Sequence, residues 1–191
     1  PDRAVSFAVP TGNFGNVLAA WAASKMGLPI HRLCIGSNRN DILTRFLDCN
    51  DMSVRGVEPS LSPSMDIQVS SNFERLLFEL LDRDSEACAR IMTQFRATGR
   101  MDVPTAAWDR ARAVFSGLHL SDEQTLDEMR ALYKRSHYLA DPHTAIGIAA
   151  ARRGHEQGVP MVAAATAHPA KFPDAVIKAT GIHPPLPKNC L

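Results

Sequence analysis

Apolar residues follow two different spacings near the start of the chain. Residues 5–9 and 30–35 are short apolar runs, which are typical of buried strands. Between them apolar residues recur at helical spacing, which predicts a helix over residues 16–26. Gly27 and Pro29 are typical of a helix end. Strand, helix and strand in this order predict a parallel βαβ unit with a right-handed crossover.

Helical signals dominate the middle of the chain. Ser71 with Glu74, and Ser121 with Gln124, have the spacing of a capping box, in which two side chains close the first turn of a helix. Pro104 is placed where it can open a further helix. We therefore predict one helix after Pro104 and others over residues 71–81, 85–97 and 121–135.

The end of the chain returns to alternating helix and strand. Asp141 followed by Pro142 is typical of a helix start. The pattern predicts a helix over 144–156, a strand over 161–165, a short helix over 174–180 and an irregular proline-rich tail over 184–191. Together the elements predict an α/β fold with a parallel sheet, divided into a βαβ part over residues 1–70, a mostly helical segment over 71–140 and a C-terminal α/β part over 141–191.

Composition places the chain among globular proteins and excludes several functions. Of its 191 residues, 45% are hydrophobic, which is enough for a core. The 21 basic and 20 acidic residues leave a net charge of +1. This balance argues against a nucleic-acid binder, because such proteins concentrate positive charge. No apolar run approaches the roughly 20 residues that a membrane helix needs.

The cysteines and the start of the chain bear on its origin. Cys34, Cys49, Cys88 and Cys190 lie far apart, and none has the spacing of a zinc site. We expect no metal, and reduced thiols in a cytoplasmic protein. The sequence begins without Met and without a signal peptide. We therefore expect a piece of a longer protein.

The strongest local motif lies between the first predicted strand and helix. It consists of Gly12, Asn13, Phe14, Gly15 and Asn16, called here the glycine loop. Its glycines favour a tight turn, and the helix start adds unpaired N–H groups with about half a positive charge. The motif predicts a phosphate site at the carboxyl edge of the sheet. It is neither a Walker loop nor a dinucleotide fingerprint. A plain turn and a G-x-x-G clamp for RNA are the alternatives.

Two further polar loops follow predicted strands. Thr166 and Lys171 come after the last strand, either as ligand-binding groups or as turn and surface residues, and nothing singles out Lys171 for a Schiff base. Asn38, Arg39 and Asn40 follow the second strand. They favour a capped turn into a helix, with a ligand-binding loop beside the glycine loop as the functional alternative.

In their order along the chain, these motifs resemble those of threonine synthases, a family of pyridoxal-phosphate enzymes with the three-layer fold type II of the tryptophan synthase β-like proteins. The matching stretches cover nearly the whole chain: residues 10–16, 38–41, 64–67, 71–75, 141–145 and 166–172. A single G-x-x-G motif is weak, but this ordered series is specific. The fold class is therefore expected to be part of such a domain with a mostly helical middle segment.

The resemblance implies a role for each motif. Pyridoxal 5'-phosphate is expected to place its phosphate on the glycine loop and its pyridine nitrogen beside Thr166. The family converts O-phospho-L-homoserine and water to L-threonine and phosphate. Asn38, Arg39 and Asn40 become candidates to bind the substrate phosphate. A hydroxyl at Thr166 cannot protonate the ring as a carboxylate could, so a moderate electron sink is expected.

One feature of the family is missing. Its Schiff-base lysine lies in a Phe-Lys-Asp motif upstream of the glycine loop, and this sequence contains no such motif. We therefore expect no catalytic residue in this chain, no activity of the chain alone, and the N-terminal part of the same enzyme as its partner. A non-catalytic phosphate-binding module and a fragment of a related pyridoxal-phosphate lyase or dehydratase are the alternatives.

Overall fold

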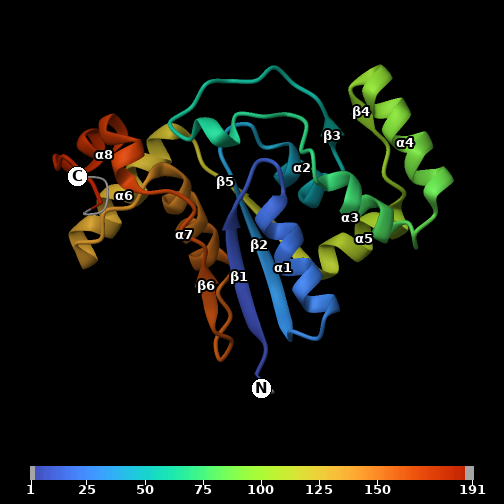
Figure 1. Ribbon diagram of the computed structural model, residues 1–191, viewed down its shortest axis with the longest axis horizontal. Helices are drawn as coiled ribbons and strands as arrows, with labels where there is room; N and C mark the ends of the chain where they lie inside the picture. Colours follow the sequence, from blue (N-terminus) through green and yellow to red (C-terminus); the bar gives the residue numbers. More distant parts are fainter. Residues whose placement is uncertain (1–2, 188–191) are drawn as a thin grey trace.

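The computed structural model describes residues 3–187. Its main sheet is parallel, in the order β5-β2-β1-β6 (Figure 1). The strands are Val5–Pro10 (β1), Ile30–Ser37 (β2), Phe115–His119 (β5) and Met161–Ala163 (β6). The predicted parallel βαβ unit is confirmed, because β1 pairs with β2 from Val5 and Ile30 to Pro10 and Gly36.

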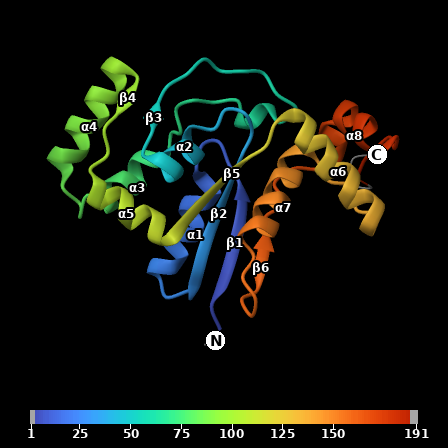
Figure 2. The same cartoon turned by 180° about the vertical axis from the view of Figure 1, so that it is seen from behind.

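Helices cover both faces of this sheet, so the domain has three layers (Figures 1 and 2). On one face, Pro142–Gly154 (α7) packs across all four strands. On the other face lie Gly15–Lys25 (α1), Ile42–Cys49 (α2) and Thr105–Val114 (α5). The remaining elements are Phe73–Leu80 (α3), Ser85–Thr98 (α4), Asp122–Ser136 (α6), Pro173–Thr180 (α8) and an antiparallel pair, Met52–Ser53 (β3) with Arg100–Met101 (β4). The predicted α/β fold is confirmed.

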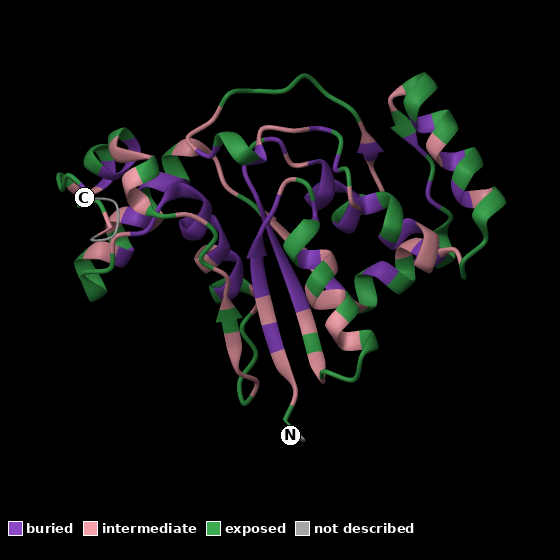
Figure 3. Cartoon of the chain, viewed as in Figure 1, coloured by how far each residue is buried: buried purple, intermediate pink, exposed green. Residues whose placement is uncertain are grey.

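Burial is concentrated in the carboxyl-terminal halves of β1 and β2 (Figure 3). Because successive side chains of a strand point to opposite faces, each strand supplies both layers of the core. Val9 and Ile35 join the larger core under α1, α2, α3 and α5, whereas Ala8 and Cys34 pack with α7. The end of the sheet that carries the candidate loops is thus its best-packed end.

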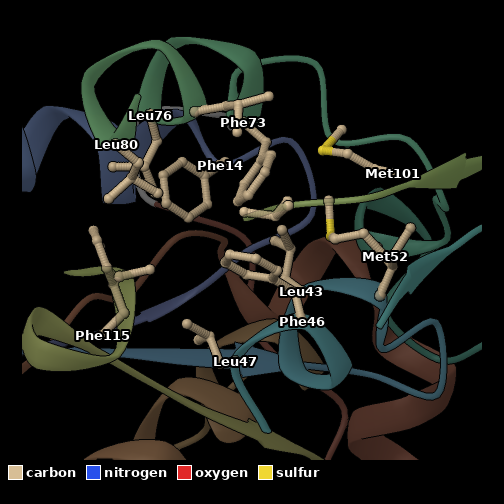
Figure 4. Packing of buried hydrophobic residues seen from close by; sticks show 14 of the residues in the cluster. Phe14, Leu43, Phe46, Leu47, Met52, Phe73, Leu76, Leu80, Met101 and Phe115 are labelled. Atoms are coloured by element: carbon tan, nitrogen blue, oxygen red, sulfur yellow. The ribbon is translucent and has the colours of Figure 1, made fainter. Parts of the chain in front are cut away.

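An aromatic cluster anchors the glycine loop to the larger core (Figure 4). The Phe14 side chain is 1% exposed and packs edge-on against Phe73 of α3, with ring centroids 5.9 Å apart. Phe14 also lies 5.8 Å from the ring of Phe115 in β5, and Phe73 lies 5.0 Å from Phe46 in α2. Phe14 therefore connects the loop directly to α3 and β5, and Phe73 extends the cluster to α2.

The segment over 71–140 is mostly helical, as predicted, but it also contains a strand that was not predicted, and one of its expected capping boxes is wrong. Strand β5 lies within the segment predicted to be mostly helical, over 71–140, and it forms the edge of the main sheet beside β2. The capping box at Ser71 is wrong, because α3 begins at Phe73 and its N-cap side chain makes no capping bond. The other predicted capping box, formed by Ser121 and Gln124, is confirmed.

The structure also describes three of the four cysteines and part of the predicted proline-rich tail. Cys34, Cys49 and Cys88 are free thiols, and Cys190 lies outside the described residues. Residues 184–187 contain no helix or strand, and the rest of the predicted tail is not among the described residues. Within residues 3–187, no helix is long and apolar enough to cross a membrane.

We expect Phe73→Ala to lower the free energy of unfolding by about 3–5 kcal/mol, because it removes the ring between Phe14 and Phe46. Tyr138→Ala is a matched control, since Tyr138 is 47% exposed. Urea unfolding followed by tryptophan fluorescence measures both. Equal losses in the two variants would contradict this account of the core.

Candidate functional site

The sheet topology brings two of the predicted motifs together. Strand β1 pairs in parallel with β6, so the glycine loop after β1 and Thr166 after β6 leave the same edge of the sheet. Both line one open cavity of about 230 Å³. Ser64, Met65, His143 and Lys171 complete its wall. The first two and His143 were not singled out as site residues from the sequence.

The glycine loop presents free backbone donors to this cavity. The Phe14 N–H donates to Thr11 Oγ1 at 3.1 Å. In the part of the chain that the structure describes, the other N–H groups of the glycine loop have no protein acceptor. Helix α1 begins at Gly15, so its N-terminal dipole adds positive potential. Such an arrangement can bind a phosphate group.

The turn itself depends on Phe14 rather than on the glycines. Phe14 adopts the left-handed conformation, with φ 63° and ψ 11°, which is rare for a bulky residue. Gly12 and Gly15 do not have positive φ values, so the expectation that glycines make the tight turn is wrong. Burial of the Phe14 ring offsets a strain of about 1–3 kcal/mol.

The glycines have different neighbours. A Cβ added to Gly12 would lie 3.1 Å from both Met65 Cα and the Ser64 carbonyl oxygen, which are backbone atoms that cannot swing away. A Cβ on Gly15 would meet only Asn72 Nδ2, at an ordinary 3.7 Å. Gly12 is therefore required for close packing of the cavity wall, whereas Gly15 leaves open space at the cavity.

Ser71 and Asn72 fix the position of Asn13. The Asn13 carbonyl oxygen accepts hydrogen bonds from the Asn72 backbone N–H at 3.2 Å and from Asn72 Nδ2 at 2.8 Å. Ser71 Oγ donates to Asn13 Oδ1 at 3.3 Å. These contacts explain why Ser71 does not cap α3, because its hydroxyl is used to hold the glycine loop.

Asn38, Arg39 and Asn40 do not line the cavity. The buried Asn38 and Asn40 side chains both donate to Asp66 Oδ1, at 2.7 and 3.1 Å. Arg39 pairs with two carboxylates on the surface. The amide groups thus fasten the 58–66 loop, which carries Ser64 and Met65, to the end of β2. Asn38 and Asn40 therefore support the cavity wall without lining the cavity themselves.

Asp141 and His143 form a buried pair at the start of α7. Asp141 Oδ1 accepts hydrogen bonds from the His143 backbone N–H and from His143 Nδ1, each at 2.9 Å, and Oδ2 accepts one from the Thr144 hydroxyl. Burial would raise the pKa of Asp141, but the hydrogen bonds from His143 and Thr144 hold that pKa below its ordinary value. His143 is 4% exposed, and its Nε2 has no partner among the described residues.

The sequence did contain a signal for this pair. A histidine two positions after an N-cap aspartate lies on the first turn of a helix, at the carboxyl edge of a predicted sheet. It was interpreted first as a helix start. That prediction is confirmed, since the Asp141 side chain caps α7 and Pro142 occupies its first turn. The same residues also orient a cavity-lining imidazole.

Thr166 and Lys171 lie at the exposed mouth of the cavity. Thr166 supplies a hydroxyl, which can donate or accept a hydrogen bond. The Lys171 ammonium lies 5.9 Å from the Phe172 ring centroid. Together with the start of α1, Lys171 gives this edge a positive potential that favours an anionic ligand.

Comparison with known proteins shows which family this chain resembles along its length. A family model described as "Threonine synthase, C-terminal" matches residues 144–190. The chain is 51% identical to the threonine synthase of Pseudomonas aeruginosa over 99% of this chain and 41% of that protein. It matches the crystal structure of PLP-bound threonine synthase from Brucella melitensis with a TM-score of 0.96 and 47% identity, over 98% of this chain and 40% of that one. For the yeast threonine synthase structure the TM-score is 0.87 at 38% identity, over 92% and 38% of the two chains.

The fold and the loops at its carboxyl edge therefore define an α/β domain with the fold of a pyridoxal-phosphate enzyme. Within that class, the chain is homologous to the C-terminal region of threonine synthases, as the order of its motifs indicated. It spans about 40% of the length of the relatives that it matches.

We expect Gly15→Val to weaken binding of inorganic phosphate about tenfold or more, because its side chain enters the space beside the free N–H groups. Its free energy of unfolding should change by no more than about 1 kcal/mol. Gly12→Val is the contrasting variant, and it should destabilise the fold more, because its neighbours are backbone atoms. Calorimetric titration and urea unfolding measure the two effects; unchanged phosphate affinity in Gly15→Val would favour a plain turn.

The Asp141 carboxylate should stabilise the fold in a pH-dependent way. Its pKa is lower in the folded than in the unfolded chain, so this stabilisation is present above about pH 4 and is lost as the pH falls through the folded pKa. Asp141→Asn keeps an oxygen to cap α7 but removes the charge. We expect it to be less stable than the wild type by about 1–2 kcal/mol at pH 7, with a gap that narrows below pH 4. Urea midpoints from pH 7 to 3 measure the gap, and a constant gap would contradict this role.

Proposed function

We propose that this chain supplies the cofactor-phosphate and ring-nitrogen side of a threonine synthase, which converts O-phospho-L-homoserine and water to L-threonine and phosphate. One observation carries the proposal: the free N–H groups of the glycine loop and the Thr166 hydroxyl line one cavity, in a chain homologous along nearly its whole length to threonine synthases. The relatives are more than twice as long as this chain. We propose that a part of the enzyme outside this sequence contributes the lysine that carries the cofactor.

The residues present fit pyridoxal 5'-phosphate. The unpaired N–H groups of the glycine loop suit its phosphate, and Thr166 offers a hydroxyl for its ring nitrogen. When bound, this cofactor supplies an electron sink for negative charge that develops at a substrate carbon. This chain holds and orients the cofactor. Removal and return of protons at the substrate carbons fall to groups outside it.

The three residues after β2 differ in what they can do for the substrate. Asn38 and Asn40 are buried, with their amide groups bonded to Asp66, so we propose that they support the cavity wall. Arg39 is the exposed member of the three, although its guanidinium already pairs with Glu58. We propose Arg39 as the remaining candidate for the substrate phosphate.

We also propose that the enzyme acts in the cytoplasm. The free thiols of Cys34, Cys49 and Cys88 agree with such a reducing compartment.

The function is tested in a chimera in which this chain replaces the homologous region of the Pseudomonas aeruginosa threonine synthase. We expect the chimera to release phosphate from O-phospho-L-homoserine, and Thr166→Ala within it to lower turnover while pyridoxal phosphate still binds. Met26→Ala, at the far end of α1 from the glycine loop and 88% exposed, is the control. A folded chimera that binds pyridoxal phosphate but releases no phosphate would contradict the proposal.

We expect the 191-residue chain alone to release no phosphate from the same substrate. Lys171 lines the cavity, but it lies in the loop that carries Thr166, on the side assigned to the ring nitrogen. Reduction with borohydride after addition of pyridoxal phosphate, followed by mass spectrometry, should show no stoichiometric label on a single lysine. Stoichiometric labelling of Lys171 together with phosphate release would overturn the assignment of the catalytic lysine to another part of the enzyme.

A further inference from the structure

His143, at the start of α7, has a buried ring nitrogen without a hydrogen-bond partner among the described residues. Its Nε2 is buried, and no described residue supplies a hydrogen bond to it. Leaving such a group unpaired costs about 1–3 kcal/mol, so buried polar atoms are rarely left in this state. His143 also lines the cavity formed by the glycine loop and Thr166. A ligand in that cavity is therefore the natural source of the missing partner.

Asp141 determines which ring nitrogen of His143 carries a proton. An ionised carboxylate can only accept hydrogen bonds, so the 2.9 Å contact from Nδ1 to Asp141 Oδ1 requires a proton on Nδ1. In the neutral imidazole, Nε2 then has a lone pair and acts as an acceptor. The Asp141 carboxylate is fixed in turn, because it accepts hydrogen bonds from the backbone N–H groups of His143 and Thr144 and from the Thr144 hydroxyl.

The imidazole cannot turn away from this orientation without loss of other contacts. The ring of Phe172 lies 4.8 Å from that of His143, at an angle of 49°. Rotation of the imidazole would also break the hydrogen bond from His143 Nδ1 to Asp141 Oδ1. The acceptor is thus held in place before any ligand binds, which lowers the entropy cost of binding.

The chemistry of a fixed acceptor distinguishes between parts of a ligand. The phosphate dianion of an ester consists of acceptor oxygens and would be repelled by the Nε2 lone pair. The free N–H groups of the glycine loop offer the donors that a phosphate needs. A ring that carries an O–H or N–H group instead offers the donor that Nε2 lacks.

We propose that His143 is a binding residue for the ring of the phosphate ester in this cavity, and that its Nε2 accepts a hydrogen bond from an O–H or N–H group of that ring. The proposal rests on the proposed function, because it takes the glycine loop as the phosphate site. It adds a second polar contact, beside Thr166, that distinguishes a ring-bearing ligand from phosphate alone. Asp141 acts through His143 as a positioning residue.

The test uses two probes with the 191-residue chain. Pyridoxine 5'-phosphate carries the ring and the phosphate but no aldehyde, so it cannot react with exposed lysines. Inorganic phosphate carries no ring. Calorimetric titration gives the Kd for each, in the wild type, in His143→Asn and in His143→Gln. Asparagine keeps a donor close to the position of Nδ1, facing Asp141, and lacks an atom at Nε2. Glutamine reaches the position of Nε2.

We expect His143→Asn to bind pyridoxine 5'-phosphate about tenfold more weakly than the wild type, with an unchanged Kd for inorganic phosphate. His143→Gln should recover part of the affinity for pyridoxine 5'-phosphate. An unchanged Kd for pyridoxine 5'-phosphate in His143→Asn would overturn the inference. An equal loss for both probes would also overturn it, because it would mean damage to the glycine loop.

Nitrogen NMR of the wild-type histidines tests the same inference without a substitution. We expect His143 to have its proton on Nδ1, and its Nε2 resonance to shift on addition of pyridoxine 5'-phosphate but not of inorganic phosphate. A proton on Nε2 with a lone pair on Nδ1 would overturn the inference. If the wild type binds neither probe, the proposed function fails together with it. If the wild type binds both probes and Nε2 does not respond, this inference alone fails.

Discussion

The parallel pairing of β1 with both of its neighbours is the constraint on which the candidate site depends. Strands that run in parallel side by side end at one edge, so the loops after β2, β1 and β6 meet there although they are far apart in sequence. The glycine loop follows the middle strand of the three and therefore has a neighbour on each side. Thr166 reaches the cavity from one side. The Asn38 and Asn40 amides support its wall from the other.

The glycine loop is rigid because one of its residues belongs to the core. Phe14 adopts a left-handed backbone conformation that an isolated turn would give to glycine, and its buried ring is held by Phe73 and Phe115. Release of that strain would require the ring to leave the core. The backbone N–H groups beside Phe14 are thus set in position before any ligand arrives, and little reorganisation is needed to bind an anion.

Local patterns in the sequence predicted those features whose causes are local. The βαβ unit, the Ser121 capping box and the Asp141 cap depend on neighbouring residues, and all three are confirmed. The features that were missed depend on distant contacts. Strand β5 is short, contains Gly117 and has no clear alternation, so its pairing with β2 identifies it as a strand. Ser71 had good capping chemistry, but its contact with Asn13, far away in the sequence, competes with the cap.

Among the candidate site residues too, local patterns predicted some, and distant contacts determine the others. The glycine loop and Thr166 could be recognised because each follows a strand, and the edge of a parallel sheet is a predictable place. The partner of Asn38 and Asn40 is Asp66, and no local pattern connects these residues. His143 was interpreted first as part of a helix start and only second as part of a ligand-binding loop. A single sequence cannot show that the ring nitrogen of such a residue lacks a partner, because that depends on everything packed around it.

Asp141 shows why fold and site cannot be separated at every position. Its carboxylate caps α7, the helix that covers all four strands of the sheet, and the same carboxylate fixes the imidazole of His143 beside the cavity. The acceptor oxygens that stabilise the helix start therefore also determine the orientation of a side chain at the site. Gly15 is the opposite case, since the space around it belongs to the cavity and not to the core. Substitutions at Gly15 can report on ligand binding alone, whereas any change at Asp141 acts on the covering helix and on the cavity together.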